Sequence, residues 1–225
     1  MRAVVFDLDG TLVESPTDIK GMKESLIEYA VSLGLDKETL STEHTTVDIV
    51  ERVYNYLVQN GFSRGYIERS LRKLNETMDR FEIESVGSVK AVEDARETLQ
   101  EIKSLGLKIG VLTRSCETYC EKALELTGMR GLVDAIEPRR DLLTAKPNPV
   151  SLLNLCSKMG VKPKDVVFFG DHTLDLECAS KVGVPFIGIS NKPEKIRSLR
   201  EKGCKRILRK ISEVTQVIKE GLHAF

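Results

Sequence analysis

Acidic, hydroxyl and basic residues stand at the ends of short apolar runs, where they could take part in chemistry. These residues are Asp7, Asp9 and Thr11 after the run 3–6, Thr113 and Arg114 after 108–112, Lys146 ahead of a helical pattern, and Asp171 and Asp175 after 166–169. Ligands of open parallel sheets bind beyond the carboxyl ends of the strands. We therefore expect these side chains to meet at one edge of a sheet.

The types of side chain in this set indicate phosphoryl transfer. Asp7 and Asp9 lie two residues apart at a strand end, so both carboxylates project to one side. Such crowding is unfavourable unless a cation relieves it, and Mg²⁺ prefers carboxylate and phosphate oxygens. One carboxylate could form an aspartyl phosphate while the other moves a proton. Thr113 and Lys146 could hold the phosphoryl oxygens, because this chemistry depends on positioning and charge stabilisation.

The segments that must position these residues alternate between strand and helix patterns. The expected strands are Ala3–Phe6, Lys108–Leu112, Val133–Ile136, Val166–Phe169, Val184–Ile189 and Arg206–Leu208. Between them, apolar residues recur at helical spacing, as in Ala91, Ala95, Leu99 and Ile102. Strands that are apolar on both faces favour a parallel sheet covered by helices. The predicted fold class is α/β, with a Rossmann-like core and helices on both faces.

One long segment contains helical patterns and no convincing strand. Residues 15–85 hold apolar sets around Leu26, Ile49 and Leu71, each at helical spacing. We expect an inserted all-helical cap over 15–85, acting as a substrate lid, and an α/β core from 1–14 and 86–225. The cap carries 9 basic and 13 acidic residues, and its net charge of −4 makes it a poor surface for nucleic acid.

The composition excludes several classes of protein. The 225 residues include 34 Lys and Arg against 34 Asp and Glu, so the net charge of zero favours neither nucleic acid nor an anionic membrane. No apolar run approaches the roughly 18 residues of a membrane span, and Met1 leads into the first strand without a signal-peptide pattern. Five cysteines match no zinc spacing. We expect a cytoplasmic protein, either a monomer or a homodimer.

The ordered motifs resemble those of the haloacid dehalogenase superfamily. They are Asp7-x-Asp9-x-Thr11, Thr113, Lys146-Pro147, and Gly170-Asp171-x-x-x-Asp175, and together they cover essentially the whole chain. The helical insertion directly after the first motif is similar to the type 1 cap of that superfamily. The run from Phe6 to Ile19 looks most like phosphoglycolate phosphatases. The resemblance therefore implies a phosphatase that acts on a small phosphorylated metabolite, with 2-phosphoglycolate as the best guess.

The resemblance also implies a role for each motif residue. Asp7 would be the nucleophile, Asp9 the general acid and base, and Thr11 the support of their turn. Thr113 and Lys146 would bind the phosphoryl group, and we place Arg114 with them although relatives often carry Asn there. Mg²⁺ would be held by Asp7, Asp9 and Asp171, the second of these through its carbonyl. Asp175 completes the candidate metal set, as a support for the metal's waters or for Lys146.

Several alternatives remain open from the sequence. Asp7 and Asp9 could simply form a turn, Thr113 could begin a helix, Lys146 could be a solvated loop residue, and Asp171 and Asp175 could cap a helix. A sugar-phosphate mutase or a phosphonate hydrolase could use the same scaffold. A receiver-like signalling domain also clusters acids with Thr and Lys, although it has no use for the insertion. His44, His172 and the cysteines receive no role.

Overall fold

The computed structural model describes residues 1–222, which divide into two compact units. One unit comprises Met1–Ser15 together with the chain from Gly87 onward, and the other is Pro16–Val86. The sequence analysis had placed these boundaries after residues 14 and 85.

The first unit is built on a six-stranded sheet in the order β5-β4-β1-β6-β7-β8, in which every neighbouring pair is parallel. The strands are β1 (Ala3–Phe6), β4 (Lys108–Leu112), β5 (Ala135–Glu137), β6 (Val166–Gly170), β7 (Phe186–Ile189) and β8 (Ile207–Leu208). All six predicted strands are present, and the expected α/β class is confirmed. The strand predicted at Val133–Ile136 lies instead at 135–137, and that predicted at Val184–Ile189 begins at 186.

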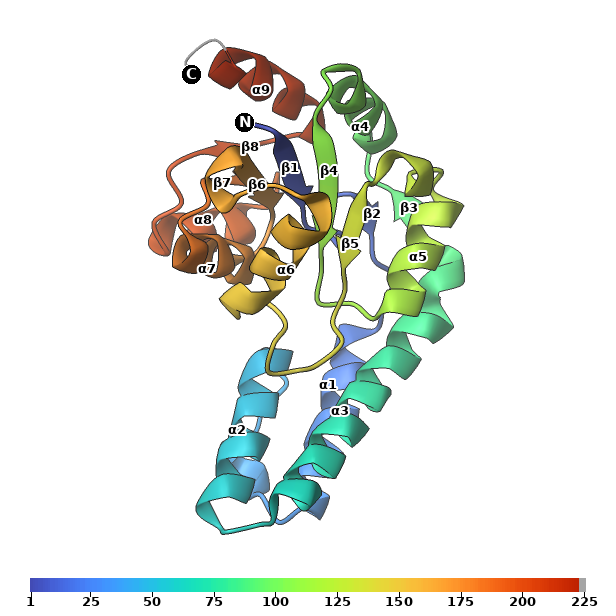
Figure 1. Ribbon diagram of the computed structural model, residues 1–225. Coiled ribbons are helices and arrows are strands. Elements are labelled where there is room, and N and C mark those ends of the chain that lie inside the picture. The colour runs from blue at the N-terminus through green and yellow to red at the C-terminus, as the bar shows by residue number, and fades with distance from the viewer. Residues whose placement is uncertain (223–225) are drawn as a thin grey trace. The chain divides into compact units, whose positions relative to one another are not determined.

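Helices cover both faces of this sheet (Figure 1). They are α4 (Ala95–Ser104), α5 (Glu117–Leu126), α6 (Pro149–Met159), α7 (Thr173–Val182), α8 (Pro193–Glu201) and α9 (Val214–Leu222). Helices α6 and α7 pack together over β4–β7, whereas α4 packs against β4 and α9. Val5, Phe168 and Leu155 belong to the core between the sheet and α6. Gly110 admits this close packing, since a Cβ there would lie 2.9 Å from the Met159 sulfur.

A short antiparallel ladder, β2 (Val13–Glu14) with β3 (Lys90–Ala91), was not predicted. It joins the two chain segments that lead into and out of the second unit. Each strand has two residues, which is too short to produce a periodic pattern.

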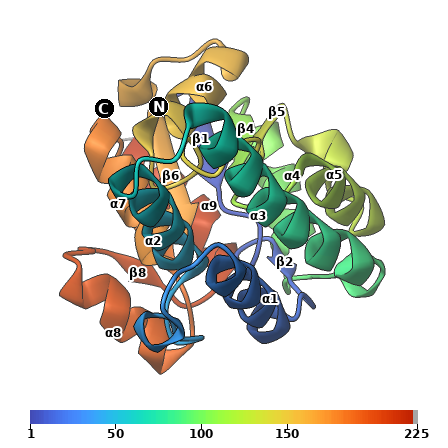
Figure 2. The same ribbon diagram turned by 90° about the horizontal axis from the view of Figure 1, so that it is seen from below.

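The second unit is helical, as the spacing of apolar residues in the insertion predicted. It comprises α1 (Ile19–Ser32), α2 (Thr46–Gln59) and α3 (Arg64–Ser85), with a 3-10 turn at Lys37–Thr39. The three helices pack against one another in pairs, and Figures 1 and 2 show α1 beside α3. Leu26, Val53 and Leu74 are fully buried in this unit. Helix α2 begins with a capping box, in which Thr45 Oγ1 accepts from the Asp48 amide at 3.1 Å and the Asp48 carboxylate accepts from Thr45.

Candidate active site

The sheet register brings the predicted motif residues together at one edge. Strand β1 lies between β4 and β6, with Phe6 opposite both Val111 and Phe169. Asp7 follows β1, Thr113 follows β4 and Asp171 follows β6, so all three emerge from adjacent strand ends. The Asp7 amide donates to the Phe169 carbonyl at 2.9 Å, which continues the ladder up to the first acidic residue.

Lys146 joins the first and last motifs. Its ammonium donates to Asp7 Oδ1 and to Asp175 Oδ1, each at 2.6 Å, and its side chain is 2% exposed. Burial alone would lower the pKa of Lys146, but the charges of Asp175 and Asp7 raise it instead. Lys146 is therefore a permanent cation beside the Asp7 carboxylate, rather than a solvated loop lysine.

Asp7, Asp171 and Asp175 form a compact acidic cluster. One oxygen of each lies within 4.8 Å of the others, and all three residues are buried. Burial, followed by repulsion from Asp7, raises the pKa of Asp171 and of Asp175. A set of hard oxygen ligands that repel one another this strongly suits a divalent cation.

The carboxylates of this cluster differ in the hydrogen bonds and ion pairs that they form with other residues. Asp175 accepts Lys146 on one oxygen and the His172 amide on the other, at 3.1 Å, so it is committed to the lysine and to the start of α7. Asp171 is held by the ammonium of Lys195, which comes from α8. The sequence analysis did not identify Lys195, because it lies 24 residues after Asp171 on another helix.

Asp9 is fixed by hydroxyl groups that follow β4. Ser115 Oγ donates to Asp9 Oδ2 at 2.6 Å, and the Tyr119 hydroxyl donates to Asp9 Oδ1 at 2.8 Å. Burial and the charge of Asp9 raise the pKa of Tyr119, which keeps it a neutral donor. Thr113 Oγ1 lies 3.5 Å from Asp9 Oδ2 and accepts from the Ser115 amide at 3.0 Å. The sequence analysis assigned no role to Ser115 or to Tyr119.

The turn after β1 is tightly built. Gly10 has a φ of +87°, and a Cβ at this position would collide with the Asp171 carboxylate. Thr11 is fully buried, and its Oγ1 has no hydrogen-bond partner among residues 1–222. The Thr11 hydroxyl therefore makes no hydrogen bond to Asp9 among the described residues, and its role as support of the turn stays a prediction.

Two arginines hold the loop that carries Lys146 through hydrogen bonds to backbone carbonyls. The guanidinium of Arg114 donates to the Lys146 carbonyl, and that of Arg139 donates to the Arg114 carbonyl. Arg139 is only 2% exposed, although nothing in its sequence context marks it as buried. Arg114 was expected to bind phosphate. In this structure its guanidinium contacts the backbone of Lys146, which is the stronger candidate for binding phosphate.

The sequence model of the family described as "Haloacid dehalogenase-like hydrolase" matches residues 4–189, most of the chain. The chain belongs to this family. It is therefore a member of a hydrolase family, as the resemblance implied.

Curated relatives refine this membership. A phosphoglycolate phosphatase of Aquifex aeolicus (strain VF5) is 27% identical over 186 residues, covering 81% of this chain and 82% of the relative. That of Escherichia coli (strain K12) is 25% identical over 207 residues, covering 84% and 81%. The resemblance to phosphoglycolate phosphatases is confirmed, and it supports the expected enzyme class, a phosphoric monoester hydrolase.

Solved structures share the fold of this hydrolase. A predicted phosphatase from Clostridium acetobutylicum has a TM-score of 0.68 at 19% identity, covering 97% of this chain and 98% of that one. A putative β-phosphoglucomutase from Thermotoga maritima has a TM-score of 0.62 at 20% identity, covering 98% and 99%. The two carry different activities in their descriptions, so fold likeness at this identity does not choose a reaction.

The residues that received no role have structural partners. His172 caps α7 by accepting from the Leu174 amide at 3.2 Å, and His44 accepts from the Ser41 amide at 3.2 Å. All five cysteines lie within residues 1–222, where each is buried and none forms a disulfide. No helix within residues 1–222 is long and apolar enough to cross a membrane.

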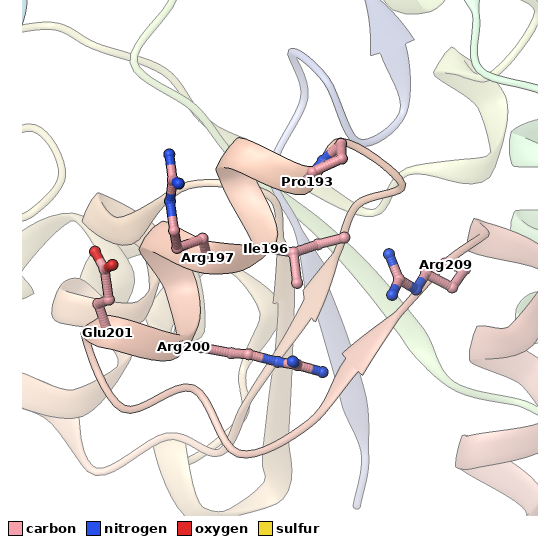
Figure 3. A pocket seen from close by; sticks show the side chains of 6 residues that line it. All are labelled: Pro193, Ile196, Arg197, Arg200, Glu201 and Arg209. Carbon is pink, nitrogen blue, oxygen red and sulfur yellow. The ribbon is translucent and has the colours of Figure 1, made fainter.

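A separate hollow of about 370 Å³ lies beside α8. It is lined by Pro193, Ile196, Arg197, Arg200, Glu201 and Arg209 (Figure 3). Figure 3 shows Arg200 and Arg209 reaching toward the space next to Ile196, whereas Arg197 points the other way. None of the motif residues lines this hollow, so it is distinct from the acidic cluster.

Proposed function

We propose that this hydrolase is a Mg²⁺-dependent phosphatase that forms an aspartyl phosphate on Asp7. The observation that carries the proposal is the buried triad of Asp7, Lys146 and Asp175 beside Asp171, with the second carboxylate, Asp9, held by neutral donors. A turn or a helix cap would not require a lysine with 2% exposure between two carboxylates.

Asp7 is prepared to act as a nucleophile. Its Oδ1 accepts from the Leu8 amide at 2.8 Å and from Lys146 at 2.6 Å. Within residues 1–222 its Oδ2 accepts no hydrogen bond, so its lone pairs are available. In the first step, Oδ2 forms a bond to phosphorus while the bond from phosphorus to the leaving oxygen breaks.

Asp9 is the proposed proton carrier. In protonated form it donates to the leaving oxygen in the first step. As a carboxylate it then takes a proton from the water that attacks phosphorus, while the bond from Asp7 to phosphorus breaks. Ser115 and Tyr119 bind opposite oxygens of this carboxylate, which restricts its rotation between the two steps.

The remaining motif residues stabilise charge. Lys146 offsets the negative charge that gathers between Asp7 and the phosphoryl oxygens, and Thr113 and Arg114 are the further candidates for phosphate contact. Asp7, Asp171 and the Asp9 carbonyl would hold the divalent cation, with Asp175 positioning Lys146. When bound, the cation supplies neutralisation of the phosphoryl oxygens. The raised pKa of Asp171 and the close approach of Gly10 to its carboxylate are consistent with such a site.

We propose 2-phosphoglycolate as the leading substrate and residues 16–86 as its lid. The support is the name shared by the curated relatives, together with a helical unit inserted directly after the first motif. A lid that closes over the site would exclude water and complete the contacts to the substrate.

Phosphate release from a panel of phosphomonoesters, with Mg²⁺ and with chelator, tests this function. The panel includes 2-phosphoglycolate, sugar phosphates, nucleotides and pyrophosphate. We expect Mg²⁺-dependent release that peaks on 2-phosphoglycolate and is abolished in Asp7→Asn. Asp165→Asn makes the same change away from the site and should remain active. Substantial activity in Asp7→Asn would exclude the aspartyl phosphate, and conversion of a sugar phosphate without phosphate release would favour the mutase alternative.

A further inference from the structure

Lys195 is a second lysine at the acidic cluster, and it differs from Lys146 in how it is held. Its ammonium forms an ion pair with Asp171 Oδ2, and its side chain is 31% exposed, against 4% for Asp171. No other side-chain hydrogen bond to Asp171 is found among residues 1–222. Lys146, by contrast, is 2% exposed and held by two carboxylates. Lys195 is therefore the cation that can leave the cluster toward solvent.

The position of this ion pair coincides with the turn that carries the first motif. An ideal Cβ on Gly10 would lie 3.2 Å from the Lys195 ammonium and in collision with the Asp171 carboxylate. The ammonium therefore lies close to the backbone of Gly10. Asp171 and the Asp9 carbonyl are among the groups proposed to hold the divalent cation. The lysine and a metal ion would accordingly compete for the Asp171 carboxylate.

We propose that Lys195 is a displaceable internal counter-ion, which neutralises Asp171 in the metal-free enzyme and must withdraw when a divalent cation binds. This inference rests on the proposed metal dependence of the function. A lysine has a flexible stem with four carbons and a compact charge, so it can swing away without moving α8. The partly exposed ion pair between Lys195 and Asp171 is weak enough for the cation to break it. In the absence of the cation, the pair compensates the charge of the buried Asp171 carboxylate.

This arrangement predicts that the lysine lowers the metal affinity of the enzyme. Only the fraction of molecules in which Lys195 has withdrawn is competent to bind the cation, and the apparent dissociation constant equals the intrinsic one divided by that fraction. We expect Lys195→Met, which keeps the alkyl stem, to bind Mg²⁺ about 5- to 30-fold more tightly. The same variant should lose stability in chelator, because Asp171 would then be buried without a partner.

The surrounding charge makes a matched control necessary. Residues 192–210 contain nine basic and two acidic side chains, a net charge of +7 in a chain of zero net charge. Removing any positive charge from this segment should strengthen cation binding slightly through long-range electrostatics. Lys192→Met removes one such charge without touching Asp171, and should change the affinity less than twofold. Lys195→Arg keeps the charge and should keep the affinity close to that of the wild type.

The experiment is calorimetric titration of Mg²⁺ into chelator-stripped protein without substrate, together with urea unfolding in chelator. The proposal requires opposite changes in Lys195→Met, namely tighter Mg²⁺ binding and lower metal-free stability. A lysine with only a structural role would lower the stability and leave the affinity unchanged or weakened, and that result would overturn the proposal. If Lys195→Met does not fold, Lys195→Gln provides the same comparison.

The same titration separates this inference from the proposed function. If wild-type protein binds Mg²⁺ and Asp171→Asn does not, but Lys195→Met binds no more tightly than wild type, the competition is refuted and the metal-dependent function stands. If wild-type protein binds no Mg²⁺ at millimolar concentration, both the metal dependence and the competition are refuted.

Discussion

Tyr119 offers the sharpest test of how the site is positioned. Its hydroxyl donates to Asp9 Oδ1 at 2.8 Å, and the raised pKa of Tyr119 keeps the proton on this hydroxyl. Tyr119→Phe removes that one donor and leaves the ring, which is fully buried, in place. If Asp9 is the proton carrier, the loss falls on the chemical step and not on the binding of substrate.

The expected magnitude follows from the type of hydrogen bond. A hydrogen bond to a charged group contributes about 1.5–3 kcal/mol, and each 1.36 kcal/mol in the activation barrier changes the rate tenfold. Tyr119→Phe should therefore lower kcat by about 10- to 150-fold while changing KM by less than about threefold. Ser115→Ala, which removes the donor to the other oxygen at 2.6 Å, should have a similar effect.

Steady-state kinetics with the best panel substrate measure this loss. Ser104→Ala is the control, because it deletes a hydroxyl outside the site and the proposed lid that donates to the Glu101 carbonyl of its own helix. The double variant Ser115→Ala/Tyr119→Phe should lose less than the two single losses combined, since both donors hold one carboxylate. If Tyr119→Phe kept the wild-type kcat, or raised KM alone, Asp9 would not be the group whose position limits the chemistry.

Three further changes test the energetics of the fold. Lys146→Met, measured by urea unfolding in chelator, should lower the free energy of unfolding by about 3–5 kcal/mol, because two buried carboxylates lose their shared cation; a loss below about 1 kcal/mol would contradict the buried pairing. Thr11→Val should leave the free energy of unfolding unchanged or raise it by about 1 kcal/mol, because it removes a buried hydroxyl without a partner; a clear loss would show that this hydroxyl is hydrogen-bonded. Burial alone would raise the pKa of Asp134, but Lys103 and the Ile109 amide lower it below its unfolded value near 3.9. This carboxylate therefore stabilises the fold above about pH 4, and its contribution is lost as the pH falls through its folded pKa. Asp134→Asn should therefore cost about 1 kcal/mol at pH 7 and nothing near pH 2, as pH-dependent unfolding would reveal.

The strands and the cap helices were predictable because local patterns determine them. A strand that is apolar on both faces is typical of the middle of a covered sheet. The run Ala3–Phe6 has this pattern, and it is fully buried. The two-residue strands β2 and β3 were missed, because their pairing depends on where the inserted unit leaves and rejoins the chain. The shift of β5 to Ala135–Glu137 has a similar origin, since its ends are set by pairing with β4 rather than by hydropathy.

The site was predictable only where residues stand directly at strand ends. Asp7, Thr113 and Asp171 follow adjacent strands, so the carboxyl-edge rule locates all three. Tyr119 was open to the same reasoning, because it lies in the first turn of the helix after β4, next to β1. Lys195 was not, since its contact with Asp171 depends on the orientation of α8.

The two lysines explain how three buried carboxylates can be tolerated before any metal binds. Asp7, Asp171 and Asp175 carry three negative charges at most, and Lys146 and Lys195 return two positive charges. The cluster is then within one charge of neutrality, which limits the cost of burying it. Exchange of Lys195 for a divalent cation would keep that balance within one charge while opening Asp171 to the metal. The two lysines would therefore have different roles. Lys146 would hold Asp7, the proposed nucleophile, in place, and the proposed withdrawal of Lys195 would let the same fold persist with or without the cation.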